Sequence, residues 1–509
     1  MKRTPAISGP GPVRNAIEFG RDPLGFLDSL RGGGVGTVQA RFVVGPTLHI
    51  VLDDTLVREV LLTNHDKYHR PDILSSRTDA LTRNGLIQSD GALWRAQRSR
   101  LQPLFGRDRI IEYCDAIGAV TEDVTGHWLE GRSFLDDSSG REGSTGTSEE
   151  GRTGDGRRGS PAAPPSSPDG STPLRVNLYE EMVGLTARVI ARTLLDRTIT
   201  PAETRRFIHA TTTVADEFEV SPVTLLRQLL PTPPATEYRR AITEMHEWAD
   251  GVIEEHRRAE NPPDNLVTRL LEAEQRATAG GSGSDGSSSA TTGDPWAPNL
   301  IRDEILTFLF AGHETTALTL CYALGFVANA PDVAERVRQE ARTVLDGDRP
   351  SWAHLQKLDY TERVIRETLR LRPPSWAIFR EAKVEAPLGD QRVREGDFVL
   401  LPQWALHRDR RYFDRPEQFD PDRWKTIDPS STPAYFPFGA GPQACIGGQM
   451  ALAEAQLVLA AIVAQFDLDI DARRLDDLRP AGVLQPRGGM SAIVIPATEW
   501  ESTCSSESA

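Results

Sequence analysis

Residues 438–447 read Phe438-Gly439-Ala440-Gly441-Pro442-Gln443-Ala444-Cys445-Ile446-Gly447, a glycine-rich segment with one cysteine, and a run of helix-forming residues follows from Gly448. Glycines let the backbone turn tightly and bring its N–H groups close to a ligand. The start of a helix carries partial positive charge, so Cys445 lies where an ionised sulfur is favoured. A lone cysteine is also commonly buried and inert. The segment therefore leaves two interpretations open, a thiolate ligand or a structural cysteine.

Length and composition bound the class of protein. The chain has 509 residues and a formal charge of -15. It exceeds the roughly 250–300 residues that one core usually supports, so we expect several domains or one large helical enzyme with subdomains. The negative charge argues against a nucleic-acid partner. The four cysteines are scattered without a C-x-x-C pair, so neither a disulfide framework nor a zinc ribbon is indicated. We recognise no signal peptide and no stretch of roughly 18 apolar residues, and we expect a soluble, cytoplasmic protein without a membrane span.

The first regular elements are predicted between residues 38 and 62. Two β-rich runs within 38–52 are split by Gly45 and Pro46, which is typical of a hairpin. A helix is expected from Asp53 onward. His65 and His69 follow at a spacing that would place two metal ligands on one helix face. No third ligand is apparent, so a metal site here is the less favoured interpretation.

Two segments, residues 136–173 and 277–294, consist mainly of Gly, Ser, Thr, Pro and charged residues. They contain too little apolar surface to order themselves, so we predict disordered insertions there, and a disordered tail at 498–509. The stretches around them are helical in pattern and mutually incomplete. We therefore interpret the insertions as long loops within one domain. The predicted helices in this region are 177–195, 201–219, 235–258 and 265–276.

The longest predicted helix spans residues 299–330 and is apolar nearly all round, so it should be central and buried. Gly312 and two threonines weaken its middle, and a threonine hydroxyl can bond back to the carbonyl of Ala311, so we expect a kink with a polar groove. Glu314 and Thr315 place an acid beside an alcohol in apolar surroundings, which makes them candidates for a proton relay. A packed threonine pair beside a salt-bridged Glu314 is the structural alternative.

Two further residue pairs are ambiguous taken alone. Trp94 and Arg98 lie four residues apart on a predicted helix, where an indole N–H and a guanidinium suit a carboxylate. A surface helix with a snorkelling arginine explains that pair equally well. Glu367 and Arg370 lie three residues apart on another predicted helix, a spacing that is common on solvated faces.

Taken together, these stretches resemble the cytochrome P450 superfamily, the haem-thiolate monooxygenases, in its soluble prokaryotic type, over residues 15–496. Phe438, Gly441, Cys445 and Gly447 match the family's cysteine loop. The order of the remaining motifs along the chain carries the rest of the match. These motifs are Ala311-Gly312-x-Glu314-Thr315 on the long helix, Glu367-x-x-Arg370, the segment around Arg423, and Trp94 with Arg98.

The resemblance implies a mainly α fold with small β-sheets, in one large domain of residues 15–497 with an α-rich and a β-rich subdomain. It implies haem b as cofactor, with Cys445 as the axial ligand of the iron. It also implies catalytic roles for Glu314 and Thr315, the first feeding protons and the second hydrogen-bonding at the oxygen-binding face. A structural network under the haem is implied for Glu367, Arg370 and Arg423. The implied cofactor-binding residues besides Cys445 are Trp94, Arg98, Ala311, Arg380, Phe438, Gly439, Gln443 and Gly447.

One position departs from the family's pattern. Where the family usually has Arg or His two residues before the cysteine, to pair with a haem propionate, this chain has Gln443. Glutamine can donate a neutral hydrogen bond but supplies no charge. Trp94, Arg98 and Arg380 are therefore expected to carry more of the propionate binding.

The implied reaction is insertion of one oxygen atom of O2 into a hydrophobic substrate. Electrons are expected from a separate ferredoxin or flavodoxin-type donor with its reductase, and the chain is expected to act as a monomer. A peroxide-driven haem-thiolate enzyme is one alternative, although such relatives generally lack the acid–alcohol pair. A non-catalytic haem sensor is the other.

Pocket residues implied by the resemblance are apolar and do not select among fatty acids, terpenoids and steroids. They are Ile73, Leu74, Leu86, Ile87, Phe308, Ala377, Ile378 and Leu484.

Overall fold

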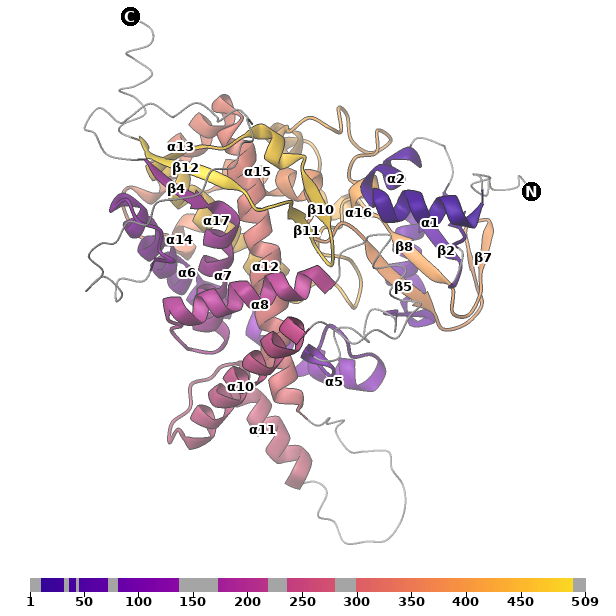
Figure 1. The fold of residues 1–509 in the computed structure, drawn as a ribbon, viewed down its shortest axis with the longest axis horizontal. Helices are drawn as coiled ribbons and strands as arrows, with labels where there is room; N and C mark the ends of the chain where they lie inside the picture. The colour runs from indigo at the N-terminus through magenta and orange to yellow at the C-terminus, as the bar shows by residue number, and fades with distance from the viewer. Residues whose placement is uncertain are drawn as a thin grey trace, which may run out of the picture.

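Helix α12 (Leu300–Ala328) runs through the centre of the molecule in the computed structural model (Figure 1). The structure describes residues 11–31, 36–42, 45–71, 81–136, 173–217, 236–279 and 299–497. The helix matches the predicted 299–330 and is buried along nearly all of its length because its apolar residues surround the axis. The α-helix is continuous through the middle of this segment, and the kink that we expected there stays a prediction. The hydroxyl of Thr315 donates to the carbonyl of Ala311 at 3.0 Å, which keeps its polar group satisfied within the helix.

The helices around α12 make up most of the fold. Helix α17 follows the cysteine loop as predicted, and α7, α8, α10 and α11 match the four helices predicted between the two insertions. The helices are α1 (Pro12–Arg21), α2 (Pro23–Ser29), α3 (Asp54–Arg58), α5 (Gly91–Leu101), α6 (Arg107–Leu129), α7 (Leu178–Leu194), α8 (Pro201–Glu217), α10 (Thr236–Arg258), α11 (Leu266–Ala279), α13 (Pro331–Leu345), α14 (Trp352–Leu355), α15 (Asp359–Leu371), α16 (Gln403–Leu406) and α17 (Gly448–Gln465).

The strands form small sheets. The largest has the order β1-β2-β8-β5-β3, in which β2 and β8 are parallel and the other neighbours antiparallel. The predicted hairpin is its β1–β2 pair, with Thr37 opposite Val51. The strands are β1 (Thr37–Ala40), β2 (Leu48–Val51), β3 (Tyr68–His69), β4 (Leu174–Asn177), β5 (Ile378–Ala382), β6 (Ala386–Leu388), β7 (Gln391–Val393), β8 (Phe398–Leu401), β9 (Phe466–Asp469), β10 (Leu478–Pro480), β11 (Leu484–Pro486) and β12 (Ser491–Pro496).

Helices and sheets occupy different parts of the molecule. Figure 1 shows β2, β5 and β8 with α1 and α2 on one side, and the helices around α12 on the other. Each part has its own apolar core: one surrounds α12 and α17, and another joins α1, α2 and the large sheet near Trp376 and Trp404. The architecture is therefore mainly α with small sheets, as predicted.

Segments on both sides of residues 137–172 pack into the same core. Phe134 precedes that segment, Val176 on β4 follows it, and both belong to the core around α12. Within the predicted insertion 136–173, residues 137–172 lie outside the described residues. The tail 498–509 and residues 280–294 of the second predicted insertion lie outside them as well. Helix α11 continues to Ala279, beyond the predicted helix end at 276, because Ala277 and Ala279 are strong helix formers.

The two histidines do not share a helix face. His65 begins a short 3-10 turn, and His69 lies on β3. Among the described residues no group of three His, Cys, Asp or Glu side chains could hold a metal ion. The spacing was misleading because the chain changes from helix to strand between the two residues.

One helix of the described part of the chain, α17, is long and apolar enough to cross a membrane, and α12 with α13, bent by 114°, passes the same test as a pair. This differs from our expectation that no such stretch exists. Because 78% of α17 is buried inside the protein, its composition is that of a core helix.

Candidate active site

The cysteine loop is a tight turn that ends at α17. The N–H of Cys445 donates to the carbonyl of Phe438 at 2.8 Å, which closes the loop on itself. Gly439 and Gly441 have φ angles of 71° and 72°, a region that favours glycine. A Cβ on Gly441 would lie 2.0 Å from the carbonyl oxygen of Leu61, so no larger residue fits there.

The thiol of Cys445 faces a cavity, whereas Cys114 and Cys321 are buried in the core. Burial raises the pKa of the Cys445 thiol, opposed by a hydrogen bond from the N–H of Gly447 and by the charge of Arg98. We expected the loop and the helix start to favour the ionised sulfur, and the net direction is the reverse. Desolvation by the cavity walls outweighs both favourable contributions.

The cavity beneath this thiol has a volume of about 500 Å³ and lies between the cysteine loop, α5, α12 and β5. It brings together residues that are far apart in the sequence. The expected residues that line it are Leu86, Ile87, Trp94, Arg98, Phe308, Ala311, Glu314, Thr315, Ile378, Arg380, Phe438, Gly439, Gln443, Cys445 and Gly447.

Three guanidinium groups line the cavity: those of Arg70, Arg98 and Arg380. Each donates to a backbone carbonyl, and among the described residues none forms an ion pair with a carboxylate. Burial and the nearby charges of Arg380 and Arg98 lower the pKa of Arg70 to about 9, and burial lowers that of Arg380 to about 10, in both cases against the opposing charge of Asp90. Like charges desolvated together are costly, so this cluster favours an anionic ligand.

Arg70 is a cavity residue that our sequence interpretation missed. Its only local signal is the following Pro71, because a residue before proline rarely adopts the helical conformation. Its position comes from tertiary structure: Nη1 donates to the carbonyl of Leu86 at 2.9 Å, which ties the chain after β3 to the segment that precedes α5.

That same segment is docked on α12 by two carboxylates. The N–H of Asn84 donates to Asp303 at 3.0 Å, and the N–H of Leu86 donates to Glu304 at 3.1 Å. Between them, a Cβ on Gly85 would lie 1.8 Å from the hydroxyl oxygen of Thr307. The close contact places Leu86 and Ile87 at the cavity and explains why a glycine occurs at 85.

On α12 the acid–alcohol pair lies at the cavity. Tyr179 donates to Oε1 of Glu314 at 3.0 Å, and the side-chain amide of Gln485 donates to the same oxygen. Burial raises the pKa of Glu314 to about 7, opposed by these two hydrogen bonds and by the charge of Arg479. Glu314 is therefore held by hydrogen bonds, and a salt bridge, the structural alternative, is not found among the described residues.

Beside the cavity, Glu367 and Arg370 form a fully buried pair. Two parallel hydrogen bonds of 2.9 and 2.8 Å join them, and Arg423 donates to Glu367 at 3.3 Å. Trp424 and the N–H of Asp420 donate to the same carboxylate, each at 3.0 Å. The spacing that was ambiguous in the sequence is thus a closed polar network.

Two of the expected pocket residues that the structure describes do not line the cavity. Ala377 and Leu484 pack in the core near Trp376, while their neighbours Ile378 and Val483 line the cavity. Successive side chains of an extended chain point to opposite sides, so an error of one residue reverses the assignment. Ile73 and Leu74 lie outside the described residues.

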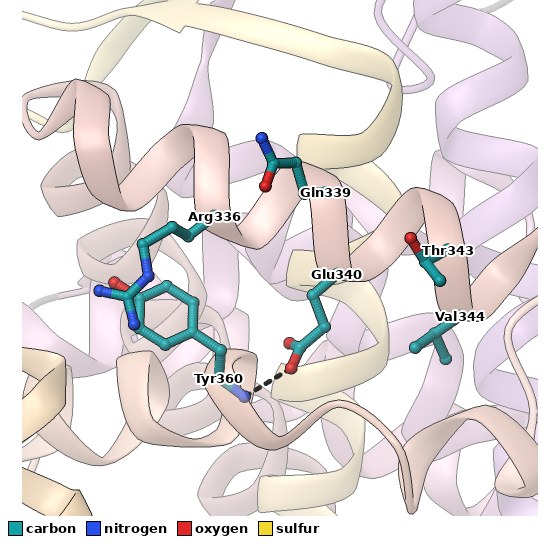
Figure 2. Close-up of a pocket in the computed structure, with 6 residues that line it drawn as sticks. All are labelled: Arg336, Gln339, Glu340, Thr343, Val344 and Tyr360. Atoms are coloured by element: carbon teal, nitrogen blue, oxygen red, sulfur yellow. Dashed lines mark hydrogen bonds between the residues drawn. The ribbon is translucent and has the colours of Figure 1, made fainter.

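A second hollow, of about 390 Å³, lies between α13 and the start of α15 (Figure 2). The guanidinium of Arg336 lies 3.8 Å from the ring centre of Tyr360. Glu340 accepts the N–H groups of Tyr360 and Thr361 at 2.7 and 2.8 Å, which caps the first turn of α15. The hollow contains none of the expected site residues and is explained by helix packing.

The residues around the cavity fit a haem group. A cysteine is a soft ligand for iron, the glycine loop leaves room beside it, and the arginine cluster supplies the positive charge that two propionates need. Fold and site together define a haem-thiolate protein.

Comparison with known proteins agrees with this class. The family model for cytochrome P450 matches residues 168–493. The chain belongs to the cytochrome P450 family, and it is a haem-dependent monooxygenase that uses O2, a hydrophobic substrate and redox partners.

Three bacterial relatives match nearly the whole chain. The cyclooctat-9-en-7-ol 5-monooxygenase of Streptomyces melanosporofaciens is 32% identical over 91% of this chain and 89% of its own length. The cyclooctatin synthase of the same organism is 28% identical over 91% of this chain and 90% of its own length. The pentalenene oxygenase of Streptomyces avermitilis is 27% identical over 96% of this chain and 97% of its own length.

Gln443 lines the cavity but adds no charge to the arginine cluster. We expect Gln443→Arg to slow haem loss, because a charge-assisted hydrogen bond to a carboxylate is roughly twice as strong as a neutral one. The measurement is the rate of haem transfer to an excess of a competing haem-binding apoprotein. Gln443→Leu serves as the control that removes the neutral donor. Equal rates for the wild type and Gln443→Arg would contradict the expectation.

Proposed function

We propose that this chain hydroxylates or epoxidises a terpenoid, using haem b held by Cys445 and electrons from a ferredoxin or flavodoxin-type donor with its reductase. The protein acts as a cytoplasmic monomer. The observation that carries the proposal is the cavity, whose largely apolar lining includes Leu86, Phe308 and Ile378. Three relatives of similar length are named for terpenoid compounds, which supports this substrate class.

The bound haem would supply oxygen activation, and the residues of this chain would supply position, charge and protons. Arg70, Arg98 and Arg380 would bind the propionates, and Trp94 would add an indole donor. Apolar side chains would exclude water and hold the substrate by shape. On α12, Glu314 would hold a proton near the reacting oxygen, and the hydroxyl of Thr315 would take part in a hydrogen bond there.

The proposal is tested by the spin-state change of the ferric protein on addition of candidate substrates. We expect terpene hydrocarbons and alcohols to give a change to high spin, and straight-chain fatty acids of equal carbon number to give less. A response to fatty acids alone would contradict the terpenoid assignment. Turnover with hydrogen peroxide, and none with a reductase system, would instead favour a peroxide-driven enzyme.

The role of Thr315 is tested by Thr315→Ala. We expect the yield of product per reductant consumed to fall by about tenfold or more, with hydrogen peroxide released, because the variant lacks the hydroxyl that directs proton transfer. Thr315→Ser keeps the hydroxyl and is the matched control. Wild-type coupling in Thr315→Ala would show that this hydroxyl has no part in the reaction.

A further inference from the structure

Glu314 is attached to the protein through one of its two carboxylate oxygens. Tyr179, from α7, and Gln485, from β11, both donate to Oε1. Among the described residues Oε2 has no hydrogen-bond partner, and Glu314 lines the cavity. Hydrogen bonds from α7 and β11 thus hold Oε1, and Oε2 remains available to a group in the cavity.

The side-chain amide of Gln485, which donates to Oε1, is itself oriented by another residue of the protein. Arg479, on β10, donates through Nε to the amide oxygen of Gln485 at 3.1 Å. Because a guanidinium only donates, it binds the amide oxygen and leaves the NH2 group directed at Glu314. The same NH2 group donates to the hydroxyl oxygen of Tyr179 at 3.1 Å, so the tyrosine proton is left for Glu314.

We propose that Gln485 and Tyr179 are positioning residues that orient Glu314 and set when it holds its proton. The proposal rests on the proposed role of Glu314 as the proton donor of the reaction. Both partners donate hydrogen bonds, so they stabilise the ionised carboxylate against burial. They keep the acid able to release its proton near neutral pH, where an isolated buried carboxyl would stay protonated.

The charged and titratable groups that act on Glu314 come from two packed elements. Tyr179 on α7 and Arg479 on β10 act on it directly, and Cys321 on α12 acts on Tyr179. Removing one donor leaves desolvation less opposed, so the pKa of Glu314 rises from about 7. Glu314 then stays protonated to higher pH.

The experiment uses the ferric holoenzyme of Tyr179→Phe and Gln485→Met. The infrared band of the protonated Glu314 carboxyl, identified by its loss in Glu314→Gln, is titrated with pH. We expect each variant to move the midpoint upward by about one pH unit, the size expected for one hydrogen bond to a charged group. The yield of product per reductant should keep its value to correspondingly higher pH.

The matched control is Tyr322→Phe. Tyr322 donates to the carbonyl of Leu484 at 2.9 Å, so its loss disturbs the same strand without touching Glu314. We expect the wild-type midpoint in this control. An unchanged midpoint in both Tyr179→Phe and Gln485→Met would overturn the inference, as would an equal rise in Tyr322→Phe.

If the proposed role of Glu314 as proton donor is wrong, the experiments give a different result. If Glu314→Gln keeps the wild-type coupling at every pH, the proposed role of Glu314 as proton donor is wrong, whatever the infrared titration shows. If Glu314→Gln uncouples the reaction and the two positioning variants behave as the wild type, only the inference on Gln485 and Tyr179 is wrong.

Discussion

Glu367→Gln is expected to give a protein that does not incorporate haem. The carboxylate of Glu367 accepts two hydrogen bonds from Arg370, and one each from Arg423 and Trp424, with both members of the Glu367–Arg370 pair fully buried. A neutral amide leaves two buried guanidiniums without a counter-charge. Breaking a buried pair from one side costs about 3–5 kcal/mol, a large share of the stability of a typical domain.

The measurement is the haem content and the unfolding temperature of the purified variant. Glu362→Gln is the control on the same helix, since Glu362 pairs with Arg366 at partly exposed positions. An exposed pair contributes about 0–1 kcal/mol, so this control should retain haem. A haem-loaded Glu367→Gln of wild-type stability would show that the network is dispensable.

The second large effect is expected at Arg380. Its guanidinium is buried at the cavity, and with Gln443 neutral it is one of three cations among the described cavity residues that are available to the propionates. Truncating one member of a buried charge pair costs about 2–5 kcal/mol. Arg380→Leu should therefore speed haem loss by at least about thirtyfold.

Arg380→Lys keeps the charge but loses the planar fork, so its rate should lie between those of the wild type and Arg380→Leu. Arg410→Leu, at an exposed position, is the control for loss of one positive charge. Haem loss at the wild-type rate in Arg380→Leu would remove this residue from the cofactor site and leave Arg70 and Arg98 as the cations that hold the propionates.

The sequence was most informative where one residue type has one physical reason to be present. Glycines at 439 and 441 are required by their positive φ angles, so the cysteine loop could be recognised from residue types alone. The length and apolar character of residues 299–330 predicted α12 and its burial correctly. Glu314 and Thr315, which we expected at a polar groove of this helix, line the cavity.

The remaining features depend on tertiary contacts. The arginine cluster is assembled from residues 70, 98 and 380, and no local pattern marks Arg70 as its member. The choice between Ala377 and Ile378 depends on strand orientation, which short apolar runs do not specify. The partners of Glu314 come from α7 and β11, so a salt bridge and a hydrogen-bonded carboxyl could not be distinguished in the sequence.

The central claim is that Cys445 binds the haem iron through its sulfur. The most direct test is the difference spectrum of the reduced protein with and without carbon monoxide, recorded for the wild type and for Cys445→His. We expect the wild type to show the long-wavelength Soret band of thiolate ligation, and the variant to show the shorter-wavelength band of imidazole ligation. A short-wavelength band in the freshly purified wild type, unchanged in Cys445→His, would contradict the assignment of Cys445 as the ligand.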